Sequence, residues 1–111
     1  MKQEVSIPLV TSNRINMPET AEEVLARGDA DMISMARPFL ADPEWVNKVA
    51  QEKVDEINTC IACNQACLDH VFKQKVASCL VNPRACHETE FNYDMASVAK
   101  KIAVVGAGPA S

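Results

Sequence analysis

The sequence predicts an α/β fold built in successive parts, and three observations lead to this prediction. Residues 5–51 alternate apolar runs and helical patterns in the order strand, helix, strand, helix, which is typical of parallel strands joined by right-handed crossovers. Residues 54–90 contain all five cysteines and have little regular periodicity. Residues 101–107 (KIAVVGA) form another apolar run before a glycine turn. We therefore expect an α/β part, an irregular cysteine-rich segment and the first strand of a second α/β part.

The first part has a start and a stop signal for each expected element. Strands are expected at residues 5–11 (VSIPLVT) and 31–36 (DMISMA), which are apolar on both faces. A helix at 18–27 has Pro18 in its first turn and is terminated by Gly28. A second helix begins with Asp42 as its cap and runs to about residue 51. Two strands do not make a stable parallel sheet, so we expect the sequence to begin inside a larger fold.

Composition excludes several classes of function. The net charge is −4 and no basic run is present, so we expect no nucleic acid partner. The longest apolar stretch, residues 102–110, is too short to cross a membrane, and the first residues do not resemble a secretory signal. An odd, clustered set of cysteines is a poor disulfide framework. We therefore expect a protein of a reducing compartment, the cytoplasm.

The strongest chemical signal is the spacing of four cysteines, Cys60-x2-Cys63-x3-Cys67-x11-Cys79. Three thiols within eight residues can converge on one centre if the backbone wraps around it, and the fourth closes the cage from a distance. This pattern favours a 4Fe-4S cluster, because zinc sites more often pair two Cys-x-x-Cys knuckles. A structural zinc and a set of buried free thiols remain the alternatives.

Three further residues of this segment could also ligate a metal. Cys86 is interpreted as a packed small residue, with a fifth thiol near the cluster as the alternative. His70 and His87 are interpreted as surface or hydrogen-bonding residues, because four thiolates already complete a tetrahedral set.

Two further groups of residues, with weaker functional signals, come directly after expected strands. Arg14 follows the first expected strand, and Ala36 and Arg37 follow the second, where the last loops of a (β/α)₈ barrel commonly bind phosphate; the alternative is a solvated charge. The turn after the last expected strand holds Gly106, Ala107, Gly108 and Pro109, and a Gly-x-Gly turn lets the backbone approach a pyrophosphate closely. The alternative here is an ordinary turn after a buried strand.

In this order the motifs resemble a known family. The runs CIACNQACLDH (60–70) and SCLVNPRAC (78–86) resemble the cluster-binding segment of NADPH-dependent 2,4-dienoyl-CoA reductases, which belong to the old-yellow-enzyme-like family. Residues 32–43 (MISMARPFLADP) resemble the end of the family's TIM barrel, and 101–109 (KIAVVGAGP) the start of its FAD-binding domain. The resemblance implies an internal fragment, and we expect this fragment to be inactive alone.

The resemblance also implies a division of the chain. Residues 1–53 would be the last βα units of an FMN-binding TIM barrel, and 54–91 the 4Fe-4S segment. Residues 92–100 would be a linker, and 101–111 the start of a Rossmann-like FAD/NAD(P)-binding domain.

Site residues follow from the same resemblance. It implies cluster ligation by Cys60, Cys63, Cys67 and Cys79, and FMN phosphate contacts from Arg14, Ala36 and Arg37. It implies an FAD turn formed by Gly106, Ala107, Gly108 and Pro109. In the family, electrons pass from NADPH through FAD and the cluster to FMN, which reduces an enoyl- or dienoyl-CoA. The family's catalytic residues lie upstream, so none is assigned. The alternative function is a small structural zinc-binding or interaction module.

Overall fold

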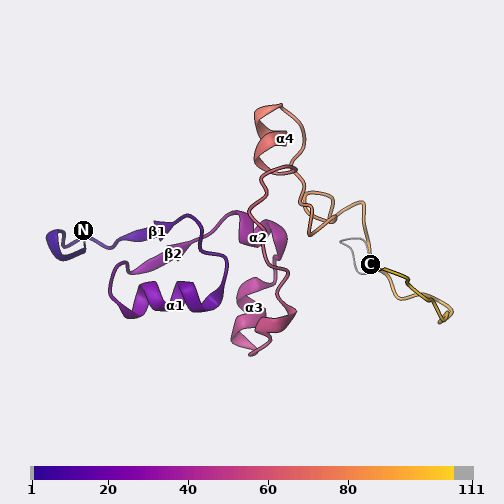
Figure 1. Cartoon of the computed structure of the whole chain (residues 1–111), viewed down its shortest axis with the longest axis horizontal. Helices are drawn as coiled ribbons and strands as arrows, with labels where there is room; N and C mark the ends of the chain where they lie inside the picture. The colour runs from indigo at the N-terminus through magenta and orange to yellow at the C-terminus, as the bar shows by residue number, and fades with distance from the viewer. Residues whose placement is uncertain (1, 107–111) are drawn as a thin grey trace.

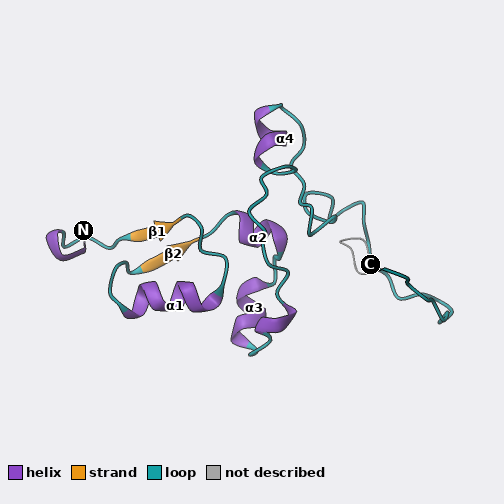
Figure 2. Cartoon of the chain, in the orientation of Figure 1, coloured by secondary structure: helices purple, strands orange, loops and turns teal. Residues whose placement is uncertain are grey.

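Two parallel strands and the helix between them form the regular part of the structure, a computed structural model that describes residues 2–106 (Figure 1). Strand β1 (Val10–Ser12) pairs with β2 (Met32–Ser34) in register Val10 to Met32, and α1 (Pro18–Ala26) connects them. Helix α1 lies along the strand pair (Figure 2). The predicted strand–helix–strand order and the parallel pairing are confirmed.

Both strands are shorter than the sequence predicts. Residues 5–9 lie outside β1, and only Leu9 extends the pairing, because its carbonyl oxygen accepts from the backbone N–H groups of Asp31 and Met32. Asp31 also accepts a hydrogen bond from the Leu9 N–H at 2.7 Å and pairs with Lys2 in a short 3₁₀ turn, Lys2–Glu4. The two-stranded sheet leaves its outer edges unpaired within the described residues, as expected of strands that need neighbours.

Three short helices and a 3₁₀ turn follow the sheet. They are α2 (Arg37–Ala41), α3 (Trp45–Ala50), the 3₁₀ turn η2 (Val54–Glu56) and α4 (Leu68–Phe72). The helix predicted from Asp42 to about residue 51 is α3, which begins three residues after Asp42. Helix α2 was not predicted, although Pro38 in its first turn is a helix-start signal.

A small apolar core joins the sheet to these helices. Ile15, Ala21, Trp45 and Ile57 are buried together, and Ile33, Met35, Val49 and Val54 pack against them. The indole N–H of Trp45 also points to the carbonyl oxygen of Asn16 at 3.4 Å. The core therefore anchors α3 and η2 against the loop that follows β1.

Asp42 fixes the path of the chain beyond α2. Its side chain is only 4% exposed, accepts from the Glu44 and Asn58 N–H groups at 3.0 and 2.8 Å, and lies 2.6 Å from Nζ of Lys48. Burial raises the pKa of this carboxyl, but the hydrogen bonds from Lys48, Asn58 and Glu44 outweigh burial and hold the pKa below its ordinary value. This carboxylate ties α2 and α3 to the segment that leads into the cysteines.

The strand predicted at residues 101–107 is absent from the described C-terminal residues. Residues 101–106 form no strand, and Ile102, Val104 and Val105 are largely exposed. A strand needs a partner for its ladder, and the described part of the chain offers none here. Ala107, Gly108 and Pro109 lie outside the described residues, so the Rossmann-like domain stays a prediction. Within residues 2–106, no helix has the length and apolar character to cross a membrane.

Candidate functional site: two adjoining cavities

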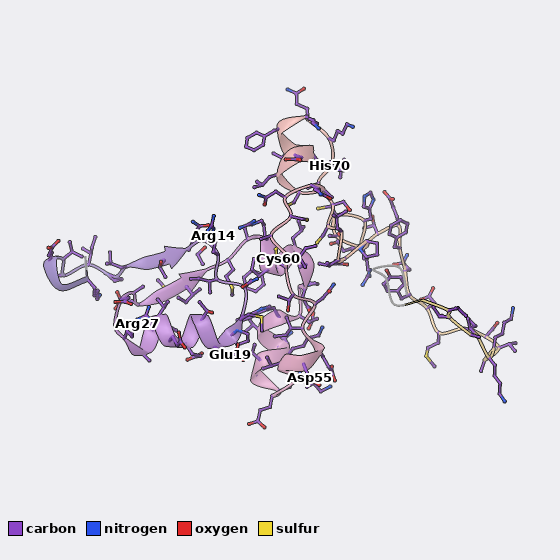
Figure 3. All side chains as sticks on the ribbon, viewed as in Figure 1. Arg14, Glu19, Arg27, Asp55, Cys60 and His70 are labelled. Atoms are coloured by element: carbon purple, nitrogen blue, oxygen red, sulfur yellow. The ribbon has the colours of Figure 1, made fainter. Side chains whose placement is uncertain are left out.

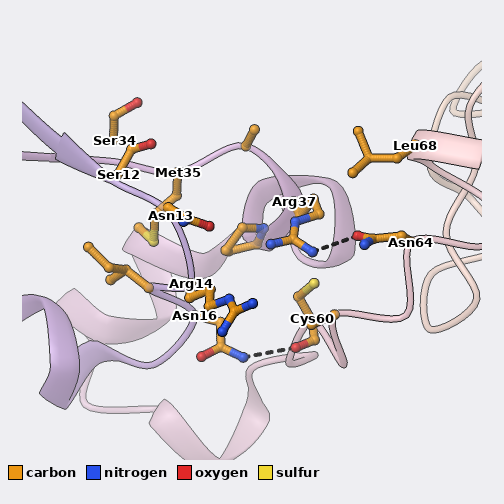
Figure 4. A pocket seen from close by; sticks show the side chains of 14 residues that line it. Ser12, Asn13, Arg14, Asn16, Ser34, Met35, Arg37, Cys60, Asn64 and Leu68 are labelled. Atoms are coloured by element: carbon orange, nitrogen blue, oxygen red, sulfur yellow. Dashed lines mark hydrogen bonds between the residues drawn. The ribbon is translucent and has the colours of Figure 1, made fainter. Parts of the chain in front are cut away.

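The larger cavity lies at the carboxyl ends of the two strands and has a volume of about 710 Å³ (Figure 4). Its walls come from the loop after β1, the loop after β2 with the start of α2, and the cysteine loop, defined here as residues 60–67. Arg14, Ala36 and Arg37 all line it. The structure thus brings together the three residues predicted to contact phosphate.

The chemistry of this lining suits an anion. Its described residues include two arginines, the hydroxyl residues Ser12 and Ser34, and three asparagines, but no aspartate or glutamate. Guanidinium, hydroxyl and amide groups can all donate hydrogen bonds to phosphate oxygens. The residues present therefore fit the phosphate group of a nucleotide or flavin.

The turn after β1 holds Arg14 in an unusual conformation. Asn13 and Arg14 both have left-handed backbones, with φ of 86° and 56°. Asparagine tolerates this region, but for arginine it costs on the order of 1–2 kcal/mol. The turn keeps the exposed Arg14 side chain at the cavity wall.

Arg37 is held from the other side of the cavity. It is the first residue of α2, after Ala36, whose side chain makes no capping hydrogen bond. Nη1 of Arg37 donates to Oδ1 of Asn64 at 2.6 Å, which links α2 to the cysteine loop (Figure 4).

A second, smaller cavity is lined by the four predicted ligands, Cys60, Cys63, Cys67 and Cys79. The rest of its wall is mostly apolar and includes Leu40, Ile61, Ala66, Leu80 and Val81. An apolar shell of this kind controls solvent access to a metal centre. The donor set fits a 4Fe-4S cluster, although the cavity, at about 10 Å³, must widen to receive one.

The spacing of the thiols bears on the zinc alternative. Among residues 2–106, no three His, Cys, Asp or Glu side chains lie close enough together to hold a single metal ion. Zinc bonds to sulfur at about 2.3 Å, so its four thiolates crowd around one point. The four thiols thus line one cavity without converging on a single point in the described part of the chain, so neither a zinc site nor a cluster site is preformed there.

The cysteine loop wraps around the smaller cavity. Ala62 and Asn64 take left-handed backbones, with φ of 56° and 62°, which turn the chain between successive cysteines. Nδ2 of Asn16 donates to the carbonyl oxygen of Cys60 at 2.9 Å and attaches the loop to the loop after β1 (Figure 4). The Ser78 N–H donates to the Ala66 carbonyl at 2.8 Å and brings the neighbouring Cys79 toward the loop.

The other candidate ligands line neither cavity. His70 lies in α4, apart from Cys60 (Figure 3), and its Nδ1 is 3.0 Å from the carbonyl oxygen of Val76. Nδ1 of His87 lies 3.0 Å from Oε2 of Glu90. Both histidines are thus hydrogen-bonding residues, as predicted. Cys86 is exposed with a left-handed backbone, so its predicted packing role is wrong, whereas the four other cysteines are half-buried.

The two cavities share a wall. Arg37, Cys60 and Asn64 each line both of them. Asn64 and Asn16 are the residues that the sequence analysis missed. Their hydrogen bonds span 27 and 44 residues, and no local pattern signals such contacts.

The chain matches one protein family over its first half and resembles known proteins over almost its whole length. Residues 1–56 match the NADH:flavin oxidoreductase / NADH oxidase family. The chain is 51% identical to a metal reductase of Desulforamulus reducens and 41% identical to an NADH oxidase of Thermoanaerobacter brockii, in each case over 99% of the chain. It covers 16% and 17% of those two proteins.

The chain also resembles solved structures in its fold. A 2-naphthoyl-CoA reductase in complex with 2-naphthoyl-CoA superposes with a TM-score of 0.76 and is 38% identical, over 80% of this chain and 14% of that one. The structural neighbours are TIM-barrel flavoenzymes, so the chain has the fold of one segment of such an enzyme.

Proposed function

The chain belongs to the NADH:flavin oxidoreductase / NADH oxidase family, and from this premise we propose that it forms the junction between an FMN site and a 4Fe-4S cluster in a longer oxidoreductase. It spans about one sixth of the length of the metal reductase and the NADH oxidase, at 16% and 17%. The activity of the whole protein is therefore part of the proposal.

The observation that carries the proposal is the shared wall of the two cavities. One cavity has two arginines and no carboxylate among its described lining residues, and the other is lined by four cysteines. Arg37, Cys60 and Asn64 belong to both. A phosphate-bearing flavin and a cluster bound in these cavities would be direct neighbours.

The chain's own residues have distinct tasks in this proposal. Arg14 and Arg37 neutralise the FMN phosphate, assisted by the backbone at Ala36. Cys60, Cys63, Cys67 and Cys79 ligate the cluster as thiolates, and the apolar wall around them excludes water. When bound, the cluster and the flavins supply the redox chemistry that carries electrons from NADPH to the double bond of an enoyl- or dienoyl-CoA.

The finer assignments extend the same proposal. Gly106, Ala107, Gly108 and Pro109 are proposed to line the turn that receives the FAD pyrophosphate. A CoA thioester as substrate is supported by the likeness to 2-naphthoyl-CoA reductase, whose structure holds such a ligand. The small-molecule substrate and NADPH would bind outside this chain, in a cytoplasmic enzyme.

Metal reconstitution tests the central part of the proposal. Under anaerobic conditions with iron and sulfide, the protein is expected to bind about four irons and four sulfides per chain and to turn brown. Cys79→Ser is expected to abolish the brown absorbance, because it removes a thiol that lines the cysteine cavity.

Cys86→Ser is the matched control, since Cys86 is exposed and lies outside both linings. It is expected to keep the iron content of the unmodified protein. Equal loss of iron in both variants would contradict the ligand assignment. Uptake of one zinc into a colourless protein that refuses iron and sulfide would support the structural zinc module instead.

A further inference from the structure

One side-chain hydrogen bond crosses the wall between the two cavities. Nη1 of Arg37 donates to Oδ1 of Asn64 at 2.6 Å, and both residues line both cavities. Among the described residues this is the only hydrogen bond of the Arg37 guanidinium. Without it, the head of this long side chain has no described partner that fixes its direction toward the phosphate cavity.

The backbone of the cysteine loop sets the position of Asn64. Asn64 follows Cys63 directly and has a φ of 62°. Its carbonyl oxygen accepts from the Asp69 N–H at 3.0 Å, which ties it to the start of α4 just beyond Cys67. Since Cys63 and Cys67 flank Asn64 and line the smaller cavity, whatever these thiols bind determines where Oδ1 of Asn64 lies.

We infer that Asn64 is a positioning residue that couples the two cavities. The inference rests on the proposed function. A cluster held by the cysteines fixes the loop, the loop fixes Oδ1 of Asn64, and Oδ1 orients the Arg37 guanidinium toward the FMN phosphate. Binding energies of this kind are linked reciprocally, so each group is bound more tightly when the other is present.

The substitution that isolates this bond is Asn64→Gly. Glycine adopts a φ of 62° without strain, so the variant removes the Oδ1 acceptor and leaves the backbone favourable. Gln74→Gly is the matched control: Gln74 has a φ of 55° on the same segment, is exposed and lines neither cavity. Asn64→Asp is the conservative variant, because a carboxylate oxygen can accept from the same guanidinium.

The experiment measures FMN affinity by fluorescence quenching in the complete protein that carries this chain, before and after reconstitution with iron and sulfide. For the unmodified protein and Gln74→Gly, reconstitution is expected to lower the FMN Kd about tenfold, the size of one charge-assisted hydrogen bond. Asn64→Gly is expected to show the same FMN Kd in both forms, and Asn64→Asp to recover the difference. Riboflavin, which has no phosphate, should bind equally in both forms.

The outcomes separate the two claims. An unmodified protein that binds no FMN would overturn the proposed function and this inference with it. FMN binding that is equally tight with and without iron would overturn the inference and leave the proposed function standing. A tenfold difference that persists in Asn64→Gly, or that riboflavin shows as well, would also overturn the inference. If Asn64→Gly takes up no iron, the iron-loaded Asn64→Asp protein decides, because losing the difference there contradicts the coupling.

Discussion

Replacing Asp42 with asparagine should loosen the segment that delivers the cysteine loop. Oδ2 of Asp42 accepts from Lys48 Nζ and the Asn58 N–H at 2.6 and 2.8 Å, and Oδ1 accepts from the Glu44 N–H at 3.0 Å. Asparagine has only one acceptor oxygen, so it can keep the hydrogen bonds of Oδ1 or those of Oδ2, but not both. Its amide N–H₂ group would then face the donor that the lost oxygen had accepted from. It also removes the charge that Lys48 faces.

The size of the effect follows from these contacts. Hydrogen bonds to a charged group contribute about 1.5–3 kcal/mol, and one neutral bond survives, so we expect a local loss of about 2 kcal/mol. That loss corresponds to about a 30-fold fall in amide protection. Hydrogen exchange followed by mass spectrometry on peptides covering residues 54–58 of the complete protein would measure it.

The control is Asp29→Asn. Asp29 pairs with Arg27 at 2.8 Å, but both side chains are more than half exposed, and such pairs contribute little. Its effect on residues 54–58 should be undetectable. Equal protection in Asp42→Asn and the unmodified protein would refute the claim that this carboxylate holds the segment.

The pH dependence of the same peptides has a defined sign. The folded-state pKa of Asp42 is lowered below its ordinary value of 3.8, so its stabilisation is fully present above pH 3.8 and is lost as the pH falls through the folded pKa. Protection, corrected for intrinsic exchange, should therefore fall in the acid range below that value. Asp42→Asn should lack this acid-dependent loss.

Two further predictions concern the 111-residue chain studied by itself. It should bind FMN poorly, because only two strands border the cavity, and saturable fluorescence quenching at micromolar FMN would show that the enclosure is sufficient. Without iron it should unfold with low cooperativity and tend to aggregate, because no large side chain among the described residues is fully buried. A single sharp, reversible calorimetric transition would contradict this expectation.

Sequence signals predicted helix α1 well, because its start and stop signals act within a few residues. Pro18 and Gly28 bracket α1 as predicted. The predicted cap of the next helix is wrong, because α3 begins at Trp45 with Glu44 at its N-cap position, and Asp42 instead ends α2. The first strand was predicted too long because residues 5–9 are apolar, but a strand also needs a ladder partner, and Pro8 has no N–H to offer one. The strand predicted at 101–107 failed over its described residues for the same reason.

The cavity residues were likewise predicted where the signal is local and missed where it depends on a distant contact. Cysteine spacing predicted four residues that line one cavity, and the positions of Arg14 and Arg37 after successive strands predicted residues that line the other. The contact between Arg37 and Asn64 joins residues 27 positions apart. It depends on how the cysteine loop docks against α2, which no periodicity or cap records.

The exposure of the five thiols has a practical chemical consequence. Four are half-buried around a cavity, and Cys86 is exposed. In air, an exposed thiol oxidises to a sulfenic acid, which then condenses with a second thiol to a disulfide. Cys86 of a second molecule is an equally exposed partner for this reaction. Cys86 is thus the thiol best placed to cross-link two chains, while oxidation within residues 60–67 would consume the donors that iron needs. The Cys86→Ser protein, prepared without oxygen, is accordingly the better starting material for loading the cysteine cavity.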